Sequence, residues 1–294
     1  MKPSLFQGVA TALITPMNQQ GIDIKALQQL VEYQIAGGVQ ALVACGTTGE
    51  PSTMSDKEWA EVVSCIIKTV NKRVPVIAGT GGNNTAKVIQ MAQTAKELGA
   101  DAQLCVTPYY NKTTQNGLVA HYKAILDASS LPMYLYNVPS RTSLDMSVST
   151  LATLSKEKNV LGVKEACGDI GKVGDIRALC GEELPIYSGS DENIVPMLSL
   201  GSKGVISVLS NFAPDITCKM TEAWFTGDVQ KAGELQVQLM PLIRILFSQV
   251  NPIVTKAALS LMGMCENYLR LPLVPMQEEA MLPLKQELAK WGLL

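Results

Sequence analysis

The sequence of 294 residues contains a single histidine, His121, and this scarcity excludes several classes of active site. A zinc site built on several imidazoles cannot be assembled, and a serine–histidine–aspartate relay would have to pass through His121. The surrounding segment, GLVAHYKAIL, has the periodicity of an amphipathic helix. We therefore predict that His121 lies at the surface or packs against a helix, and that the protein binds no metal.

The sequence also lacks an excess of either charge and lacks long apolar runs. It has 24 basic and 26 acidic residues, a formal net charge of −2. Neither a basic face for nucleic acid nor a polybasic tract for a membrane is indicated. No segment approaches the roughly 18 apolar residues of a membrane helix, and polar residues interrupt the start, MKPSLFQGVATALITPM, which predicts a first strand and no signal peptide. We expect a small neutral or anionic ligand, with no nucleic acid or membrane partner.

Disulfide and nucleotide-binding patterns are missing as well. The cysteine count is seven, an odd number, and no two cysteines form a C-x-x-C pair, which predicts reduced thiols and a cytoplasmic protein. The glycine-rich segments GTTGE (46–50) and GTGGNNT (79–85) do not match a phosphate loop, and no dinucleotide fingerprint follows the first predicted strand. We interpret GTGGNNT as a turn and expect no cofactor.

What the sequence does contain is a regular alternation of short apolar runs with helical segments. Hydrophobic residues make up 47% of the chain, enough for a large core. The apolar runs, which we predict to be parallel strands, are residues 8–15, 41–46, 74–80, 102–108, 132–139, 160–165, 185–190 and 204–210. This pattern predicts a (β/α)8 TIM barrel, with a doubly wound open sheet as the alternative.

The alternation stops near residue 227. From there on the periodicity is helical only, in the segments 228–249, 252–264 and 276–292. We therefore predict two units, a catalytic (β/α)8 barrel over residues 1–226 and a C-terminal helical extension over residues 227–294.

Polar residues gather where the predicted strands end, which is where barrel enzymes carry their catalytic groups. These are GTTGE (46–50), TPYYNK (107–112), YNVPSRT (136–142), Lys164 and SGSDEN (188–193). Taken singly, several have simpler explanations: Tyr109 and Tyr110 could pack, and Arg141 could form a surface ion pair. We expect Asp191 and Glu192 to stabilise the amino end of the following helix, and their charge disfavours a phosphorylated substrate.

Lys164 ends the apolar run VLGVK and is the strongest candidate for a catalytic group. A lysine at the mouth of an apolar barrel loses hydration, which favours the neutral amine that attacks a carbonyl. The alternative is a side chain that extends its charged end out to solvent. Schiff-base chemistry moves protons, and without a nearby histidine the hydroxyls of Thr47, Tyr136 and Tyr110 would have to carry them.

With these residues in place, the sequence resembles the pyruvate-dependent class I aldolases and lyases, and within them the dihydrodipicolinate synthases. The resemblance covers nearly the whole chain and runs through the segments GVATALITPM, ACGTTGEPSTM, VTPYYNK, YNVPSRT, GVKEA, YSGSDEN and NPIVTKAALSLMGM. It implies that Lys164 forms the Schiff base with pyruvate and that Thr47, Tyr136 and Tyr110 relay protons.

The resemblance also implies a substrate site and an assembly. Thr48 and the main chain of Gly189 and Ile206 would line the pyruvate site, and Arg141 would hold the carboxylate of aspartate 4-semialdehyde through its bidentate guanidinium. Tyr110 would reach the site of a neighbouring subunit, which implies a homo-oligomer, commonly a dimer of dimers.

The implied reaction joins pyruvate to aspartate 4-semialdehyde on the route to diaminopimelate and lysine. Two alternatives stay open at this point. One is a related lyase or aldolase of a 2-keto sugar acid, such as sialic acid or a keto-deoxy acid. The other is a barrel that only binds a keto acid, which the complete set of candidate catalytic residues argues against.

One departure from the family pattern concerns feedback by lysine. Relatives that bind free lysine use histidines after GTTGE and a glutamate early in the helix after GTG. Asn83 and Tyr109 match the family's other ligands, but the histidine positions hold Asp56 and Trp59 and the glutamate position holds Lys87. A lysine there repels the effector's ammonium, so we predict insensitivity to lysine, unless Asp56 supplies a carboxylate from another direction.

Overall fold

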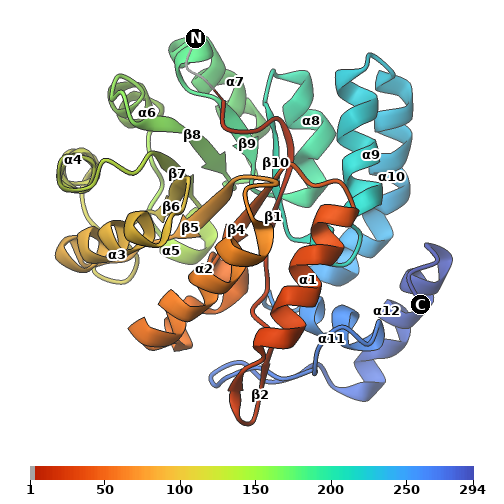
Figure 1. Cartoon of the computed structure of the whole chain (residues 1–294). Helices are drawn as coiled ribbons and strands as arrows, with labels where there is room; N and C mark the ends of the chain where they lie inside the picture. Colours follow the sequence, from red (N-terminus) through yellow and green to blue (C-terminus); the bar gives the residue numbers. More distant parts are fainter. Residues whose placement is uncertain (1–3) are drawn as a thin grey trace.

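The computed structural model describes residues 4–294, so the first three residues of the predicted 1–226 unit lie outside the described residues. Eight parallel strands close into a barrel, in the order β1-β10-β9-β8-β7-β6-β5-β4 (Figure 1). Their bounds are β1 (Gly8–Ala12), β4 (Ala41–Ala44), β5 (Val76–Gly79), β6 (Ala102–Val106), β7 (Met133–Asn137), β8 (Val160–Glu165), β9 (Ile186–Ser188) and β10 (Gly204–Ser207). Each lies within one of the predicted runs, so the (β/α)8 prediction is confirmed and the open sheet was wrong.

The apolar runs form barrel strands because both of their faces are covered. Inward-facing side chains fill the barrel, and outward-facing ones contact the surrounding helices, so the runs need no polar alternation. Tyr134, Tyr187 and Ile206 belong to the core inside the barrel, whereas Leu135 and Val163 pack in a second cluster with the helices. The short β2 (Met17–Asn18) and β3 (Gly21–Ile22) form a separate antiparallel pair after β1.

Helices surround the barrel (Figure 1). They are α1 (Ile24–Ala36), α2 (Asp56–Val70), α3 (Thr85–Leu98), α4 (Gln115–Ala128), α6 (Val148–Leu154), α7 (Ile170–Cys180), α8 (Ile194–Ser199) and α9 (Pro214–Phe225), with α5 (Pro139–Thr142) as a single turn after β7. Ser55 and Glu58 form a capping box at the start of α2, and Gly99 ends α3 in the left-handed conformation. His121 is buried in α4 with Nδ1 2.9 Å from the Thr85 hydroxyl, so the helix-packing prediction is confirmed.

Three further helices follow the barrel, α10 (Val229–Leu246), α11 (Ile253–Leu261) and α12 (Met281–Lys290). In Figure 1, α10 lies beside α9, and α11 and α12 lie near the lower part of α1. Leu239 of α10 and Val254 of α11 belong to the same apolar cluster as Leu30 of α1. The extension therefore packs on the barrel, and its boundary at residue 227 stays a prediction. Among the described residues, no helix has the length and apolar character to cross a membrane.

Candidate active site

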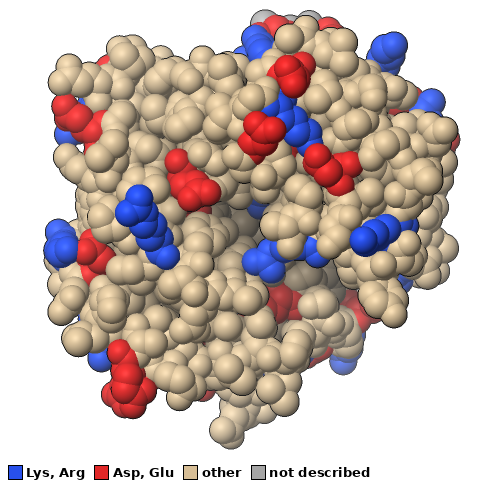
Figure 2. Space-filling model, turned by 180° about the vertical axis from the view of Figure 1, so that it is seen from behind, with Lys and Arg blue, Asp and Glu red and all other residues tan. Residues whose placement is uncertain are grey.

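A cavity of about 440 Å³ lies at the carboxyl ends of the strands. Seen from behind the view of Figure 1, the surface is hollowed near its centre, with Lys or Arg atoms in its depth (Figure 2). Thr47, Tyr136 and Arg141 line the cavity, from the segments after β4, on β7 and after β7. The chain thus brings together polar groups that are far apart in sequence, because parallel strands present their carboxyl ends at one face.

Lys164 lies inside the barrel on β8, directly opposite Tyr136 of β7 in the strand register. The residue is only 4% exposed, and its Nζ lies 4.3 Å from the centre of the Tyr136 ring. The alternative in which the charged end extends to solvent is therefore wrong. An ammonium over an aromatic face is attracted by the ring quadrupole, which holds the side chain in one place.

Because Gly189, directly after β9, has no side chain, there is room beside it for the Lys164 side chain. A Cβ at this position would lie 3.1 Å from Lys164 Cε and 2.7 Å from the Ala166 Cβ, both too close for an ordinary contact. Its backbone N–H donates to the Glu165 carbonyl at 2.8 Å, which fixes the turn beside β8. Gly189 therefore borders the lysine, and Ile206 of β10 belongs to the core inside the barrel.

Thr47 and Thr48 belong to a short 3₁₀ helix, η1 (Thr47–Gly49), that follows β4. The Thr48 side chain is buried, and its Oγ1 accepts a hydrogen bond of 2.8 Å from Asn251 Nδ2. Since the amide already donates to this oxygen, the hydroxyl hydrogen of Thr48 is free to donate elsewhere. The backbone carbonyl of Asn251 also lies 3.5 Å from Arg141 Nη2. One residue of the extension thus contacts both predicted substrate-binding side chains, a role that sequence reasoning missed.

Beneath this segment lies a buried ion pair between Glu50 and Lys256. The carboxylate and the ammonium are 2.5 Å apart, and their side chains are 2% and 0% exposed. Lys256 also donates to the Tyr268 carbonyl at 2.9 Å, and burial lowers the pKa of this lysine while Glu50 opposes that shift. The sequence signal that could have revealed it is the lysine within the otherwise apolar run PIVTKAALSL. The pair anchors α11 to the loop that carries Thr48.

Asp191 does not stabilise the helix that follows it, and that prediction was wrong. Although Asp191 begins the short η4 (Asp191–Asn193) before α8, its carboxylate turns toward the next strand. It accepts hydrogen bonds from the Ser207 hydroxyl and from the backbone N–H groups of Val208 and Leu209, at the start of η5 (Leu209–Asn211). The reason is tertiary: β9 and β10 are neighbours in the barrel, which brings the two loops together.

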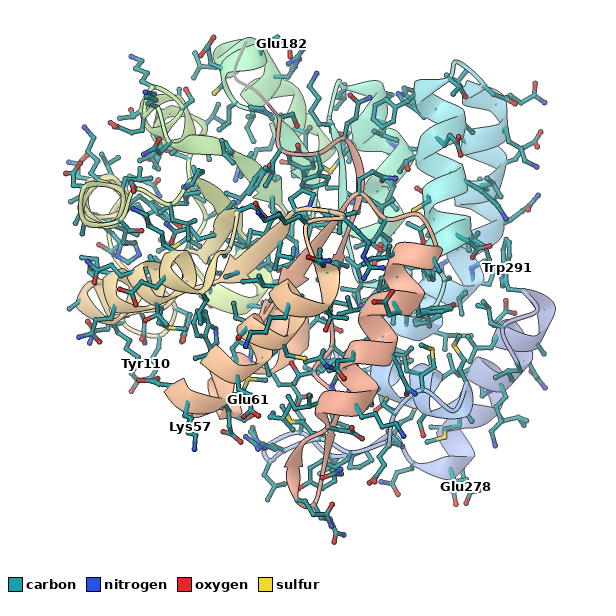
Figure 3. The ribbon with its side chains drawn as sticks, in the orientation of Figure 1. Lys57, Glu61, Tyr110, Glu182, Glu278 and Trp291 are labelled. Atoms are coloured by element: carbon teal, nitrogen blue, oxygen red, sulfur yellow. The ribbon has the colours of Figure 1, made fainter. Side chains whose placement is uncertain are left out.

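Tyr110 stands apart from the other predicted catalytic residues. It is 91% exposed, has a left-handed backbone with φ of 67°, and does not line the cavity. Figure 3 shows it at the edge of the molecule, pointing outward. Within one chain, therefore, Thr47 and Tyr136 line the cavity, Lys164 lies against Tyr136, and Tyr110 does not join them.

The cavity also reaches the positions that were compared above with the relatives that bind free lysine. Asp56, Trp59, Asn83, Lys87 and Tyr109 all line it. The Lys87 ammonium forms an ion pair with the Asp56 carboxylate, and Trp59 Nε1 donates to the Gly79 carbonyl at 3.1 Å. The carboxylate that could have received an effector's ammonium is thus paired with a lysine of the chain itself. Within residues 4–294, no three His, Cys, Asp or Glu side chains cluster as metal ligands would.

The fold and this cavity define a class of protein: a (β/α)8 barrel whose buried lysine can act as an amine nucleophile toward a carbonyl substrate. A model of the Dihydrodipicolinate synthetase family matches residues 5–290. The 4-hydroxy-tetrahydrodipicolinate synthase of Geobacter metallireducens is 48% identical over 272 residues, which are 92% of this chain and 94% of that protein. The chain belongs to the dihydrodipicolinate synthetase family, and it is a lyase.

Solved structures agree with this assignment. The dihydrodipicolinate synthase of Thermotoga maritima has a TM-score of 0.97 and 41% identity, and the match covers 99% of this chain and 100% of that one. The dihydrodipicolinate synthase of Acinetobacter baumannii, solved in complex with pyruvate, has a TM-score of 0.96 and 43% identity, covering 98% of this chain and 100% of that one.

Proposed function

We propose that this chain condenses pyruvate with L-aspartate 4-semialdehyde through a Schiff base on Lys164, the reaction of a 4-hydroxy-tetrahydrodipicolinate synthase. The observation that carries the proposal is a lysine only 4% exposed, held 4.3 Å from the Tyr136 ring. Burying a lysine side chain costs free energy, and the need for an amine nucleophile in the site explains why this cost is tolerated. The names of the curated relatives favour this reaction over cleavage of a 2-keto sugar acid.

The first half of the reaction forms the enamine. Neutral Lys164 Nζ adds to C2 of pyruvate, the carbinolamine oxygen is protonated and leaves as water, and a cationic iminium remains. Loss of a proton from C3 then gives the enamine. Tyr136, which lies against Lys164, and Thr47 line the cavity with their hydroxyl groups, and they carry these protons.

The second half forms the carbon–carbon bond and the ring. The enamine C3 attacks the aldehyde carbon of the semialdehyde, whose oxygen takes up a proton, and the iminium on Lys164 is restored. The amino group of the semialdehyde then adds to C2 and displaces the lysine, which closes the six-membered ring. Arg141 faces the cavity and binds the semialdehyde carboxylate through paired N–H donors. Thr48 and the main chain of Gly189 and Ile206 border the pyruvate.

The active form is a homo-oligomer in which Tyr110 completes the site of a second copy. A tyrosine that is 91% exposed at the edge of its own chain has no packing role there, which supports an intersubunit one. A dimer of dimers would provide this arrangement with closed symmetry.

Borohydride reduction in the presence of pyruvate tests the proposed chemistry. Reduction turns the iminium into a stable secondary amine, and peptide mass mapping locates it. We expect label on Lys164 and none on Lys256, which is even more deeply buried and is paired with Glu50. Lys164→Arg should abolish both label and activity. Label on another lysine, or active enzyme without label, would refute the mechanism.

A further inference from the structure

Asp191 is a buried charged group that the mechanism above does not use. Its residue is 1% exposed, and both carboxylate oxygens have donors. Oδ1 accepts from the Ser207 hydroxyl at 2.6 Å, and Oδ2 accepts from the backbone N–H groups of Val208 and Leu209, each at 3.0 Å. All of these partners donate to the carboxylate oxygens, and such donors favour the ionised form.

The pKa of Asp191 depends on its burial, its hydrogen bonds and the charge of Lys164. Burial raises the pKa of Asp191, whereas the three hydrogen bonds and the positive charge of Lys164 act in the opposite direction. Burial is the largest of these effects, so the pKa of Asp191 is raised overall.

The hydrogen bonds of Asp191 join the main-chain segment that borders Lys164 to the end of β10. Gly189, two residues before it, packs against the lysine side chain. Ser207, its hydroxyl partner, directly follows Ile206 on β10. The carbonyl of Asp191 is held in turn by Gln236 Nε2 of α10 at 3.1 Å.

We infer that Asp191 is a positioning residue for the Schiff base. Its carboxylate ties the turn that carries Gly189 to the end of β10 and so holds the main chain of Gly189 against the Lys164 side chain, in position for addition to pyruvate. This inference rests on the proposed function, since it concerns the same lysine.

The test compares two substitutions that each remove one negative charge from the same turn. Asp191→Asn keeps the shape but turns one accepting oxygen into an N–H donor that faces other donors, whereas Glu192→Gln alters an exposed neighbour. For each protein, the fraction of Lys164 trapped by borohydride is measured across a pyruvate series, together with kcat, the KM for pyruvate and the melting temperature. We expect Asp191→Asn to need about tenfold more pyruvate for half-maximal trapping, the scale of losing a hydrogen bond to a charged group, and Glu192→Gln to match the wild type.

A further variant removes only one of the hydrogen bonds. Ser207→Ala removes one hydrogen bond and keeps the carboxylate, so its half-saturating pyruvate should rise less than that of Asp191→Asn. Equal half-saturation in Asp191→Asn and wild type, or a lowered melting temperature with unchanged KM, would overturn the inference and leave Asp191 a structural residue. Absence of pyruvate-dependent label on wild-type Lys164 would instead overturn the proposed function.

Discussion

The buried ion pair between Glu50 and Lys256 leads to a quantitative prediction about stability. Apart from Lys256, neither oxygen of the Glu50 carboxylate has a hydrogen-bond partner within residues 4–294. Replacing Lys256 with methionine, which has a similar length, leaves this carboxylate buried and unpaired. Breaking a buried pair in this way costs about 3–5 kcal/mol, because the remaining charge has lost its compensation.

The magnitude can be checked by unfolding in denaturant and by heating. We expect Lys256→Met to lower the free energy of unfolding by about 3–5 kcal/mol and the melting temperature by about 6 °C or more. The double variant Lys256→Met/Glu50→Gln should recover much of this loss, because no unpaired charge remains. Since Glu50 follows the 3₁₀ helix that carries Thr48, the single variant should also bind pyruvate less tightly.

Lys219→Met is the matched control. It makes the same chemical change in an ion pair with Asp215, at 3.2 Å, whose side chains are 67% and 48% exposed. Exposed pairs contribute about 0–1 kcal/mol, so this variant should be nearly as stable as the wild type. If Lys256→Met lost no more stability than Lys219→Met, the argument that burial makes the Glu50 pair essential would be refuted.

Three further predictions concern the site. Arg141→Ala should leave pyruvate trapping on Lys164 nearly intact but reduce use of the semialdehyde about ten- to a hundredfold, the effect of losing a charged hydrogen-bond partner; steady-state kinetics with unimpaired semialdehyde use would contradict it. Tyr110→Phe should lower kcat, and wild type should sediment as a dimer or tetramer at assay concentration; a fully active monomer would exclude an intersubunit role. Because Lys87 is paired with Asp56, free lysine should not inhibit initial rates at limiting pyruvate, and half-inhibition below about 1 mM, an ordinary metabolite scale, would show the interpretation of Lys87 to be wrong.

Sequence reasoning located the barrel strands because parallel strands buried on both faces are continuous apolar runs bounded by turns. The same local pattern placed Lys164 at a strand end, next to a run that water does not reach. The residues around it could be grouped without a structure, since a (β/α)8 barrel gathers all strand ends at one face. Thr47, Tyr136 and Arg141 do line one cavity.

By itself, then, the sequence determined the order and identity of the strands and placed Lys164 at a strand end, both from local periodicity, and the barrel fold then implied the face that carries polar groups. The burial of Lys164 was decided by the tertiary structure. Only the tertiary structure decided which distant side chains support that face. Asn251 reaches Thr48 across 203 positions of the chain, and Asp191 turns to Ser207 instead of the helix beside it. Such pairs carry no periodic signal, because a single hydrogen bond or buried charge is selected by the geometry that packing creates.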